Sequence, residues 1–315
     1  MATSPVLPLV FNHIPKCAGT SVRTALLEAL QPASDVYFLD FSLVGGYDKL
    51  EDAAPALQAK FVRRPADLPD AELVTGHISP GTTQVRYPGV AHVTILRNPA
   101  CRVISQWVHS RSMTEIDLRN WGPAYPTRIA RRPLAEYLQH AMIAPNIDNT
   151  ITRFLVWPEE RLSPTSFIDP AEDDALFDAA MARLDSFHHV NVVENRQFMA
   201  ELGASLGVEL EGIRLNDRAS YPPVVATDLT SEMTPETREL LEQRTRIDRR
   251  VWTAIAQRVL PDADPAAVLA EGLADSVRRY SAMPAAPRRG GVARRTAERV
   301  LRAKARLDPR LKGFR

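Results

Sequence analysis

Short apolar runs alternate with amphipathic segments along most of the chain. Runs of β-favouring residues at 6–11, 36–39, 72–75, 91–96 and 190–193 predict strands. Apolar residues recur at helical spacing in the segments 22–30, 100–110, 134–142, 173–187, 195–206 and 234–260. Strands that alternate with helices favour an α/β fold: a three-layer sandwich with a mainly parallel sheet, whose ligands bind at the carboxyl ends of the strands.

Two longer segments, 111–133 and 157–174, lack regular periodicity and are rich in proline and charged residues. Irregular segments of this length often form lids or surfaces that bind an acceptor. Prolines and glycines gather again between 284 and 291, which predicts a linker. We therefore expect one domain over residues 1–283, followed by a linker and a basic helical tail over residues 284–315.

The formal net charge of +1 is unevenly distributed. The last 38 residues, 278–315, contain 13 Lys and Arg against 2 Asp and Glu, so that they carry +11 while residues 1–277 carry −10. Such a tail can contact an anionic partner or fold back on the acidic body. The apolar stripe of the tail is modest, which favours a solvated or self-docked helix, and we expect no nucleic-acid partner.

Composition narrows the class of protein further. Hydrophobic residues make up 45% of the 315 positions, which excludes disorder of the whole chain. The sequence lacks both a transmembrane run of about 18 apolar residues and a secretory signal. Two cysteines, Cys17 and Cys101, are too few for a disulfide framework, so we expect both to be reduced. These features favour a cytoplasmic enzyme whose oligomeric state the sequence leaves open.

Residues 11–21, Phe-Asn-His-Ile-Pro-Lys-Cys-Ala-Gly-Thr-Ser, join the first predicted strand to the first predicted helix. Backbone N–H groups at a helix N-terminus bind phosphate or sulfate, and Lys16 adds a compact cation. Gly19, Thr20 and Ser21 complete a P-loop-like nucleotide site. A nucleotide-triphosphate loop would place the lysine directly after the second glycine, whereas Lys16 precedes Gly19.

A second motif follows the predicted strand 91–96. It reads Arg-Asn-Pro from Arg97, and Ser105 stands eight residues further on in the next helix. Together, the two motifs resemble the 5′-phosphosulfate loop and the 3′-phosphate element of sulfotransferases that use 3′-phosphoadenosine 5′-phosphosulfate, of the carbohydrate type. The continuation from Ser105 to His109 is most similar to heparan sulfate 6-O-sulfotransferases, in which the histidine of this segment contacts the acceptor sugar.

Weaker similarities extend the resemblance over roughly residues 8–260. Segments 149–155 and 190–194 resemble the family's Asn-x-x-Thr-Arg-x-Leu element and its late strand. Segment 215–220, followed by Asp248, is similar to the loop that closes over the cofactor and to the C-terminal helix. The resemblance thereby implies cofactor contacts for Arg218 and Ala219.

The resemblance implies a sulfuryl transfer to a hydroxyl of a carbohydrate or of a glycosylated or other small molecule. Such an in-line displacement requires a proton acceptor and a donor that stabilises the leaving phosphate, and it requires no metal. His77, in a glycine-flanked loop after a predicted strand, matches the family's catalytic histidine, and an imidazole suits proton abstraction near neutral pH. Lys16 is the candidate for stabilising the leaving group. Arg97 and Ser105 would hold the 3′-phosphate, and His109 the acceptor.

Several of these residues also have purely structural interpretations. His77 can be a structural loop histidine, and His109 can pack on its helix. We expect His13 to be a core residue or to support the site residues from behind, Trp107 to be a core residue, and Cys17 to contribute its backbone N–H rather than its thiol. A long polyanionic acceptor would be repelled by the acidic body unless arginines of the irregular segment line its path, namely Arg111, Arg119, Arg128, Arg131 and Arg132.

Two further classes of function remain open. The same scaffold is used by kinase-like phosphotransferases, which would prefer ATP to a 3′-phosphorylated nucleotide. A non-catalytic binding module could keep the fold and use the basic tail to recognise a partner. The chain retains the candidate site residues Lys16, His77, Arg97 and Ser105, which argues against such a loss of catalytic activity.

Overall fold

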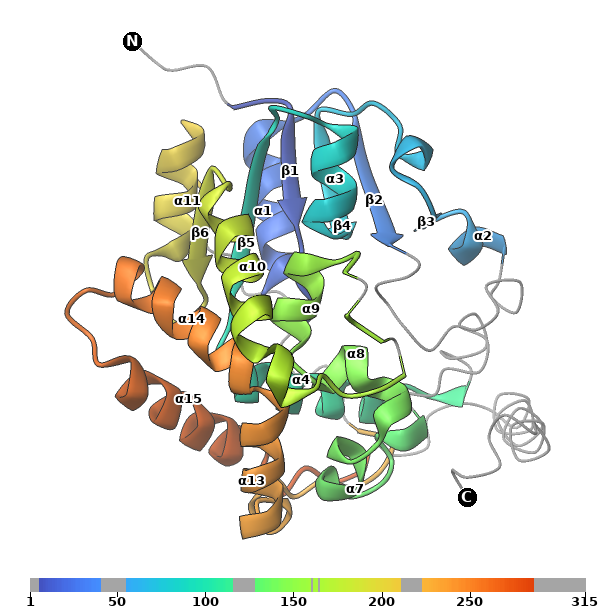
Figure 1. Cartoon of the computed structure of the whole chain (residues 1–315), viewed down its shortest axis with the longest axis vertical. Coiled ribbons are helices and arrows are strands. Elements are labelled where there is room, and N and C mark those ends of the chain that lie inside the picture. Colours follow the sequence, from blue (N-terminus) through green and yellow to red (C-terminus); the bar gives the residue numbers. More distant parts are fainter. Residues whose placement is uncertain are drawn as a thin grey trace.

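Six parallel strands form one sheet in the computed structural model, which describes residues 6–40, 55–115, 128–159, 161–163, 165–210 and 223–285. The spatial order is β3-β2-β4-β1-β5-β6, which places β1 in the middle of the sheet (Figure 1). The strands are β1 (Leu9–Asn12), β2 (Asp35–Asp40), β3 (Phe61–Val62), β4 (Leu73–His77), β5 (Ala91–Leu96) and β6 (His189–Val192). The α/β class and the parallel sheet expected from the sequence are confirmed.

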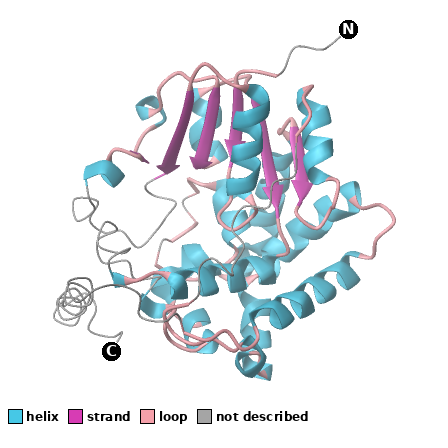
Figure 2. Ribbon diagram, turned by 180° about the vertical axis from the view of Figure 1, so that it is seen from behind, coloured by secondary structure: helices cyan, strands magenta, loops and turns pink. Residues whose placement is uncertain are grey.

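Helices cover both faces of this sheet (Figures 1 and 2). Alternate residues of β1 pack on opposite sides: Leu9 and Phe11 contact α1 and α11, whereas Val10 packs in a separate cluster with Tyr87, directly after α3. Both faces of the central strand are therefore apolar, as a doubly covered parallel sheet requires. The helices are α1 (Gly19–Leu30) and α11 (Phe198–Leu206) on one face, and α3 (Pro80–Arg86), α9 (Thr150–Val156) and α10 (Asp173–Asp185) on the other.

A second, all-helical core lies beyond the carboxyl ends of the strands (Figure 1). Trp107 of α4 is fully buried there, and its indole Nε1 donates to the carbonyl of Arg132 at 3.3 Å, which confirms the prediction that Trp107 is a core residue. This core supports the loops that leave the sheet. Its helices are α4 (Pro99–Ser112), α7 (Leu134–Leu138), α8 (Ala144–Ile147), α12 (Leu229–Glu232), α13 (Pro235–Arg244) and α15 (Pro265–Tyr280). Two further helices lie outside this core. α14 (Arg246–Val259) packs against α9 and α10, and α2 (Pro55–Gln58) precedes β3.

The helix predicted over 234–260 is interrupted at Thr245, between α13 and α14. Asn149 explains the break, because its Oδ1 accepts hydrogen bonds from the backbone N–H groups of Ile247 and Asp248, at 2.9 and 3.3 Å, and so caps α14. Its own N–H donates to the carbonyl of Arg244 at 2.7 Å. A tertiary contact with a residue almost 100 positions away thus divides one continuous apolar pattern into two helices.

Several elements of the fold had no counterpart in the sequence-based predictions, namely β3 and the helices α2, α3, α8, α9, α12 and α15. β3 has only two residues, too few for a periodic signal, and α15 follows the last segment for which a helix was expected. Most of the basic tail, residues 286–315, lies outside the described residues. Among the residues that are described, no helix has the length and apolar character needed to cross a membrane.

Candidate active site at the carboxyl ends of the strands

The loop between β1 and α1, residues 13–18, is the candidate for holding an anion and is called the anion-binding loop below. Lys16 (φ 70°) and Ala18 (φ 58°) both adopt the left-handed conformation, which non-glycine residues rarely take. Such strained positions persist only where the surrounding structure holds them, and they cluster at ligand-binding sites. Ala18 provides no side-chain cap for α1, whose first turn also lacks an acidic residue. The first N–H groups of α1 and the positive end of its dipole can therefore hold an anion.

Gly19, the first residue of α1, allows the imidazole of His13 to lie directly against the start of the helix. A Cβ atom on Gly19 would lie 1.8 Å from Cδ2 of His13, which is far inside van der Waals contact. The His13 ring stacks on Phe11, with the ring centroids 5.6 Å apart, and its centroid lies 4.5 Å from that of His77. His13 is 8% exposed, as expected for a core residue, and it connects the anion-binding loop to the loop of His77.

His77 ends β4 and lies next to β1 in the sheet. Its Nδ1 lies 2.7 Å from the carbonyl oxygen of His13. Because a carbonyl can only accept, Nδ1 of His77 carries the proton and donates it, which leaves Nε2 as an unprotonated acceptor. The hydrogen bond to the His13 carbonyl thus fixes the tautomer of His77 in the form that a general base requires.

The surroundings of His77 also keep the ring neutral. The pKa of His77 is lowered from 6.5 to about 4, mainly by burial and also by the positive charge of Lys16, while the hydrogen bond to the His13 carbonyl opposes both effects. The pKa of His13 is also lowered well below its usual range, first by burial and then by the charges of His77 and Lys16. Lys16 is therefore close enough to act electrostatically on both rings, which are uncharged at neutral pH.

Arg97 joins the loop after β5 to the loop after β1. Its Nη1 donates to the carbonyl of Lys16 at 3.1 Å, across the central pair of strands. The following residue, Asn98, caps α4 by accepting from the N–H of Cys101 at 3.3 Å, and its own N–H donates to Glu194 Oε1 at 2.9 Å. These bonds fix the strand end that carries Arg97, so that the structure brings Lys16, His77 and Arg97 together at one edge of the sheet.

A third basic residue, Arg102, lies beneath this edge and was not singled out from the sequence. Arg102 is 1% exposed; its Nη2 donates to the carbonyl of Asn146 at 2.5 Å, whereas Nε and Nη1 have no hydrogen-bond partner among the described residues. Burial lowers its pKa, and the negative charge of Asp248 opposes that effect. The positive charges of Arg102 and Arg97 both reach Cys17 in the anion-binding loop. A buried, incompletely paired guanidinium increases the positive potential at this loop.

The remaining predicted site residues differ in accessibility. Thr20 is exposed and Ser21 half-buried in the first turn of α1, as expected for residues that contact a ligand. Ser105 is 3% exposed on α4, so that a ligand could reach its hydroxyl only after some rearrangement. His109 is half-buried one helical turn after Ser105, on the same side of α4. Arg218 and Ala219 lie outside the described residues.

Cys17 lies in the anion-binding loop but cannot act as a nucleophile there. Its side chain is fully buried, and burial raises the pKa of the thiol to about 12 despite the nearby charges of Arg102 and Arg97. A thiol with this pKa stays protonated at neutral pH. The thiol is therefore no candidate for catalysis, as expected, whereas the backbone N–H of Cys17, expected to contribute to the loop's ligand site, donates to the carbonyl of Ile14 at 3.2 Å. Both cysteines are free.

The arginines that were considered for guiding a polyanionic acceptor are instead used within the fold. Arg111 is 3% exposed and donates to Thr227 Oγ1 at 2.7 Å and to three backbone carbonyls. Arg128 and Arg131 both pair with the buried carboxylate of Glu115. Arg119 lies outside the described residues. Arg132, whose side chain is 41% exposed, lies 4.0 Å from Glu136. Of the described arginines in this set, only Arg132 is therefore substantially exposed to an acceptor.

A separate polar network stabilises the helices behind the anion-binding loop. Asp248 is 1% exposed and accepts from the N–H groups of Ile151 and Thr152 and from Thr152 Oγ1, at 2.7 to 3.0 Å. Arg153 pairs with the buried Asp148 at 2.8 Å. The segments 149–155 and Asp248, similar to family elements in sequence, thus contact each other and hold α9 against α14.

In the described part of the chain, no group of three or more His, Cys, Asp or Glu residues has an arrangement that could hold a metal ion. The sequence matches no protein-family model, and no curated protein matches it. The chemistry of the site must therefore be inferred from its own residues.

Proposed function

We propose that this protein is a sulfotransferase that moves a sulfuryl group from 3′-phosphoadenosine 5′-phosphosulfate to a hydroxyl of a carbohydrate or another small molecule. The observation that carries the proposal is the convergence of Lys16, His77 and Arg97, from three separate strand ends, on one strained loop at a helix N-terminus. The resemblance of the two motifs to carbohydrate sulfotransferases supports the same conclusion.

In this proposal, His77 and Lys16 act on opposite sides of the sulfur atom. Nε2 of His77 accepts the proton of the acceptor hydroxyl while that oxygen forms a bond to sulfur. The bond between sulfur and the bridging oxygen of the 5′-phosphate breaks on the other side, and the ammonium of Lys16 stabilises the negative charge that develops there. The fixed tautomer of His77 favours this role, because only Nε2 is free of a proton.

The donor substrate fits the positive surroundings of the loop. The N–H groups of the first turn of α1, with Gly19, Thr20 and Ser21, would hold the 5′-phosphosulfate. Arg97 and Ser105 would hold the 3′-phosphate, and the incompletely paired charge of Arg102 would add to the attraction. Arg218 and Ala219 would close over the nucleotide, and His109 would contact the acceptor.

Transfer of labelled sulfate from the donor to a panel of sugars and small hydroxyl compounds tests the reaction. We expect Lys16→Ala and His77→Ala to slow transfer at least about a hundredfold, and the exposed Lys60→Ala to leave it unchanged. Binding of adenosine 3′,5′-bisphosphate, the product of the donor, is measured separately by calorimetry. Arg97→Ala should weaken this binding at least tenfold, whereas Arg250→Ala, at an exposed ion pair with Asp174, should not. Failure of the wild-type protein to bind the bisphosphate would contradict the proposal.

The same measurements separate the alternatives. A kinase-like phosphotransferase would bind ATP in preference to the 3′-phosphorylated nucleotide and would transfer labelled phosphate. A non-catalytic module would bind the bisphosphate without transferring sulfate to any acceptor. The fixed, neutral state of His77 next to Lys16 favours an enzyme over a module, since binding alone requires neither feature.

A further inference from the structure

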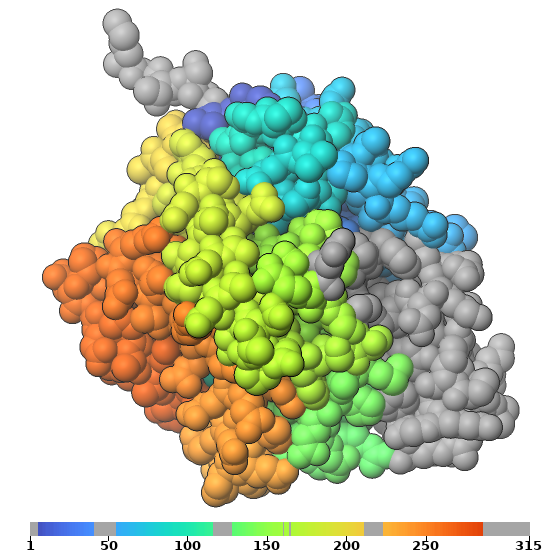
Figure 3. All heavy atoms as spheres, viewed as in Figure 1, coloured from blue at the N-terminus to red at the C-terminus, as the bar shows by residue number. Residues whose placement is uncertain are grey.

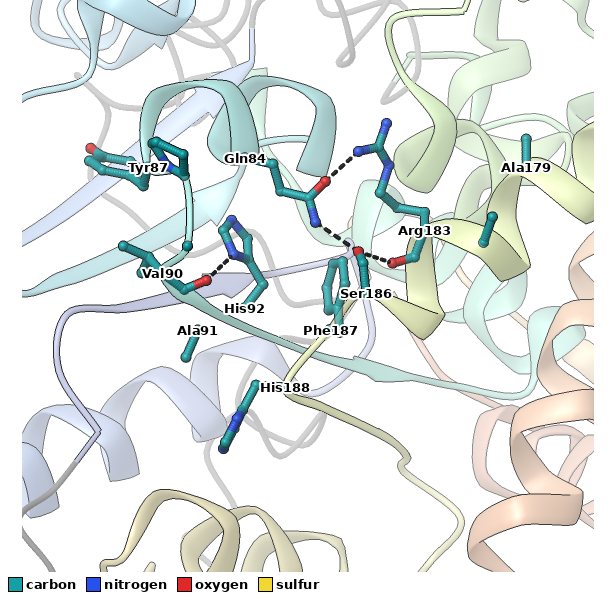
Figure 4. Close-up of a pocket in the computed structure, with 13 residues that line it drawn as sticks. Gln84, Tyr87, Val90, Ala91, His92, Ala179, Arg183, Ser186, Phe187 and His188 are labelled. Carbon is teal, nitrogen blue, oxygen red and sulfur yellow. Dashed lines mark hydrogen bonds between the residues drawn. The ribbon is translucent and has the colours of Figure 1, made fainter.

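A cavity of about 820 Å³ opens at the amino ends of β5 and β6, on the opposite edge of the sheet from the anion-binding loop. α3 and α10 form its two walls, and both lie on the face of the molecule seen in Figure 3. Figure 4 shows Arg183 of α10 extending toward Gln84 of α3, with His92 and Phe187 at the base of the cavity. Ligand-binding pockets commonly have volumes of about 300 to 1,000 Å³, so the size fits a small organic molecule.

The lining of this cavity is basic although the body of the protein is acidic. None of the 13 lining residues is Asp or Glu, whereas Arg183, His92 and His188 are among them. Arg183 donates to the side-chain oxygen of Gln84, a neutral amide, and Gln84 in turn donates to Ser186 Oγ at 2.9 Å. No carboxylate of the described residues forms an ion pair with Arg183.

A half-buried guanidinium without an anion is an unfavourable arrangement, because desolvation is not offset by an opposite charge. Burial accordingly lowers the pKa of Arg183. A carboxylate accepts two parallel hydrogen bonds from a guanidinium and would remove this penalty. The rest of the lining includes two aromatic rings, Tyr87 and Phe187, and the aliphatic side chains of Val90 and Ala179, which suit an apolar body.

We propose that this cavity, called here the amino-edge pocket, binds a small organic acid whose carboxylate pairs with Arg183 and whose apolar or aromatic body packs against Phe187 and Tyr87. The pocket shares no residue with the proposed sulfuryl-transfer site, and the proposal does not depend on that activity.

His92 is a poor probe of this pocket, because its ring also supports the other edge of the sheet. Nδ1 of His92 donates to the carbonyl of Val90 at 2.8 Å, and Nε2 lies 3.1 Å from Thr83 Oγ1. Thr83 Oγ1 in turn accepts from Asn12 Nδ2 at 3.0 Å, and Asn12 directly precedes the anion-binding loop. Arg183 and Ala182, which is exposed, are therefore the better positions to change.

The test uses 2-naphthoate as the probe and 2-naphthamide as its neutral analogue, titrated into the full-length protein by calorimetry. We expect 2-naphthoate to bind one site at least tenfold more tightly than the amide. Arg183→Gln should weaken binding of 2-naphthoate at least tenfold, which corresponds to about 1.4 kcal/mol. Ala182→Trp, which fills the pocket from an exposed position, should abolish binding of both compounds. The control Arg258→Gln removes an exposed arginine of α14 that pairs with Asp185 of α10, the helix that carries Arg183. It should leave the affinity unchanged.

Thermal melting of each variant shows whether the fold is retained. Equal affinity for the acid and the amide, or unchanged affinity in folded Arg183→Gln, would overturn the proposal. Absence of saturable binding to the wild-type protein would also overturn it. A loss of binding in Lys16→Ala together with unchanged binding in Arg183→Gln would show that the probe occupies the carboxyl edge instead, and would likewise refute the amino-edge pocket.

Discussion

Each edge of the sheet holds a histidine. The two rings form the same kind of hydrogen bond through Nδ1 but differ at Nε2. His77, at the carboxyl edge, donates from Nδ1 to the carbonyl of His13, and His92, at the amino edge, donates from Nδ1 to the carbonyl of Val90. Burial lowers the pKa of both rings. Nε2 of His92, however, is bonded to Thr83 Oγ1, whereas no described residue bonds to Nε2 of His77. The second nitrogen therefore distinguishes a ring available for proton transfer from one used in packing.

The two edges also differ in the number of positive charges that surround them. At the carboxyl edge, Lys16, Arg97 and Arg102 surround one loop, while at the amino edge Arg183 alone provides a permanent positive charge among the lining residues. A doubly or triply charged anion such as a nucleotide is suited to the first arrangement, and a single carboxylate to the second. The two proposals thus place anions of different charge at opposite edges of the sheet.

The largest expected effect comes from removing the ring of His77, whose Nε2 is available for proton transfer. His77→Ala should reduce kcat for sulfate transfer by about 10² to 10⁴, the usual contribution of a general base, while binding of adenosine 3′,5′-bisphosphate changes little. His92→Ala should act mainly on stability, by about 1 to 3 kcal/mol, because it removes a buried ring together with its hydrogen bonds to the Val90 carbonyl and Thr83 Oγ1. Steady-state kinetics and denaturant unfolding of both variants measure the two effects. A larger loss of kcat in His92→Ala than in His77→Ala would reverse the assignment.

The next effect concerns the glycine that lets His13 approach α1. Gly19→Ala places a Cβ atom onto the His13 ring and should lower stability by about 1 to 3 kcal/mol, with a shift of the ring resonances of His13 and His77. Gly89, in the turn before β5, has φ 76° and open space around its missing Cβ. Gly89→Ala should therefore cost about 1 to 2 kcal/mol through backbone strain alone, without moving those resonances. Thermal melting measures the loss of stability in both variants. NMR spectra show whether the imidazole resonances move, which distinguishes the steric clash in Gly19→Ala from the backbone strain in Gly89→Ala.

The sequence predicted much of the fold because most of its elements have local periodicity. The strands at 91–96 and 72–75 and the helices that begin near Ala100 and Asp173 were found within a few residues of β5, β4, α4 and α10. The break at Thr245 was not predicted, because it depends on Asn149 capping α14 from a distant segment. Local patterns carry no information about a cap of this kind.

The site was predictable to the extent that its residues follow strand ends. His77 ends β4, Arg97 directly follows β5 and Lys16 lies in the loop after β1, and parallel strands bring such positions together. The tautomer of His77 and the incomplete pairing of Arg102 were not predictable, since both depend on contacts between separate strands and helices. Arg102 lies among buried residues on every side of α4, where no amphipathic pattern distinguishes a functional charge from a structural one.

A smaller effect is expected from the buried cation at the carboxyl edge. Arg102→Met should weaken binding of adenosine 3′,5′-bisphosphate by about tenfold, because it removes one positive charge from beneath the loop while keeping an apolar side chain of similar length. Stability should change little, since a guanidinium with two unpartnered nitrogens contributes less than a fully bonded one. Calorimetric titration and thermal melting measure the two quantities. Unchanged affinity in the folded variant would restrict Arg102 to a structural role.

The sharpest comparison of the two edges is in the titration of the two rings. In the free protein, His77 should titrate near pH 4 instead of 6.5, and the native state should lose stability as the pH falls from 6.5 toward 4, because the unfolded chain takes up this proton first. Adenosine 3′,5′-bisphosphate brings negative charge next to Lys16 and should raise the pKa of His77, while that of His92 stays constant. NMR titration of the imidazole resonances, assigned with His77→Ala and His92→Ala, measures both. An equal shift of the two rings would mean that the nucleotide acts on the whole sheet and that the carboxyl edge is not where it binds.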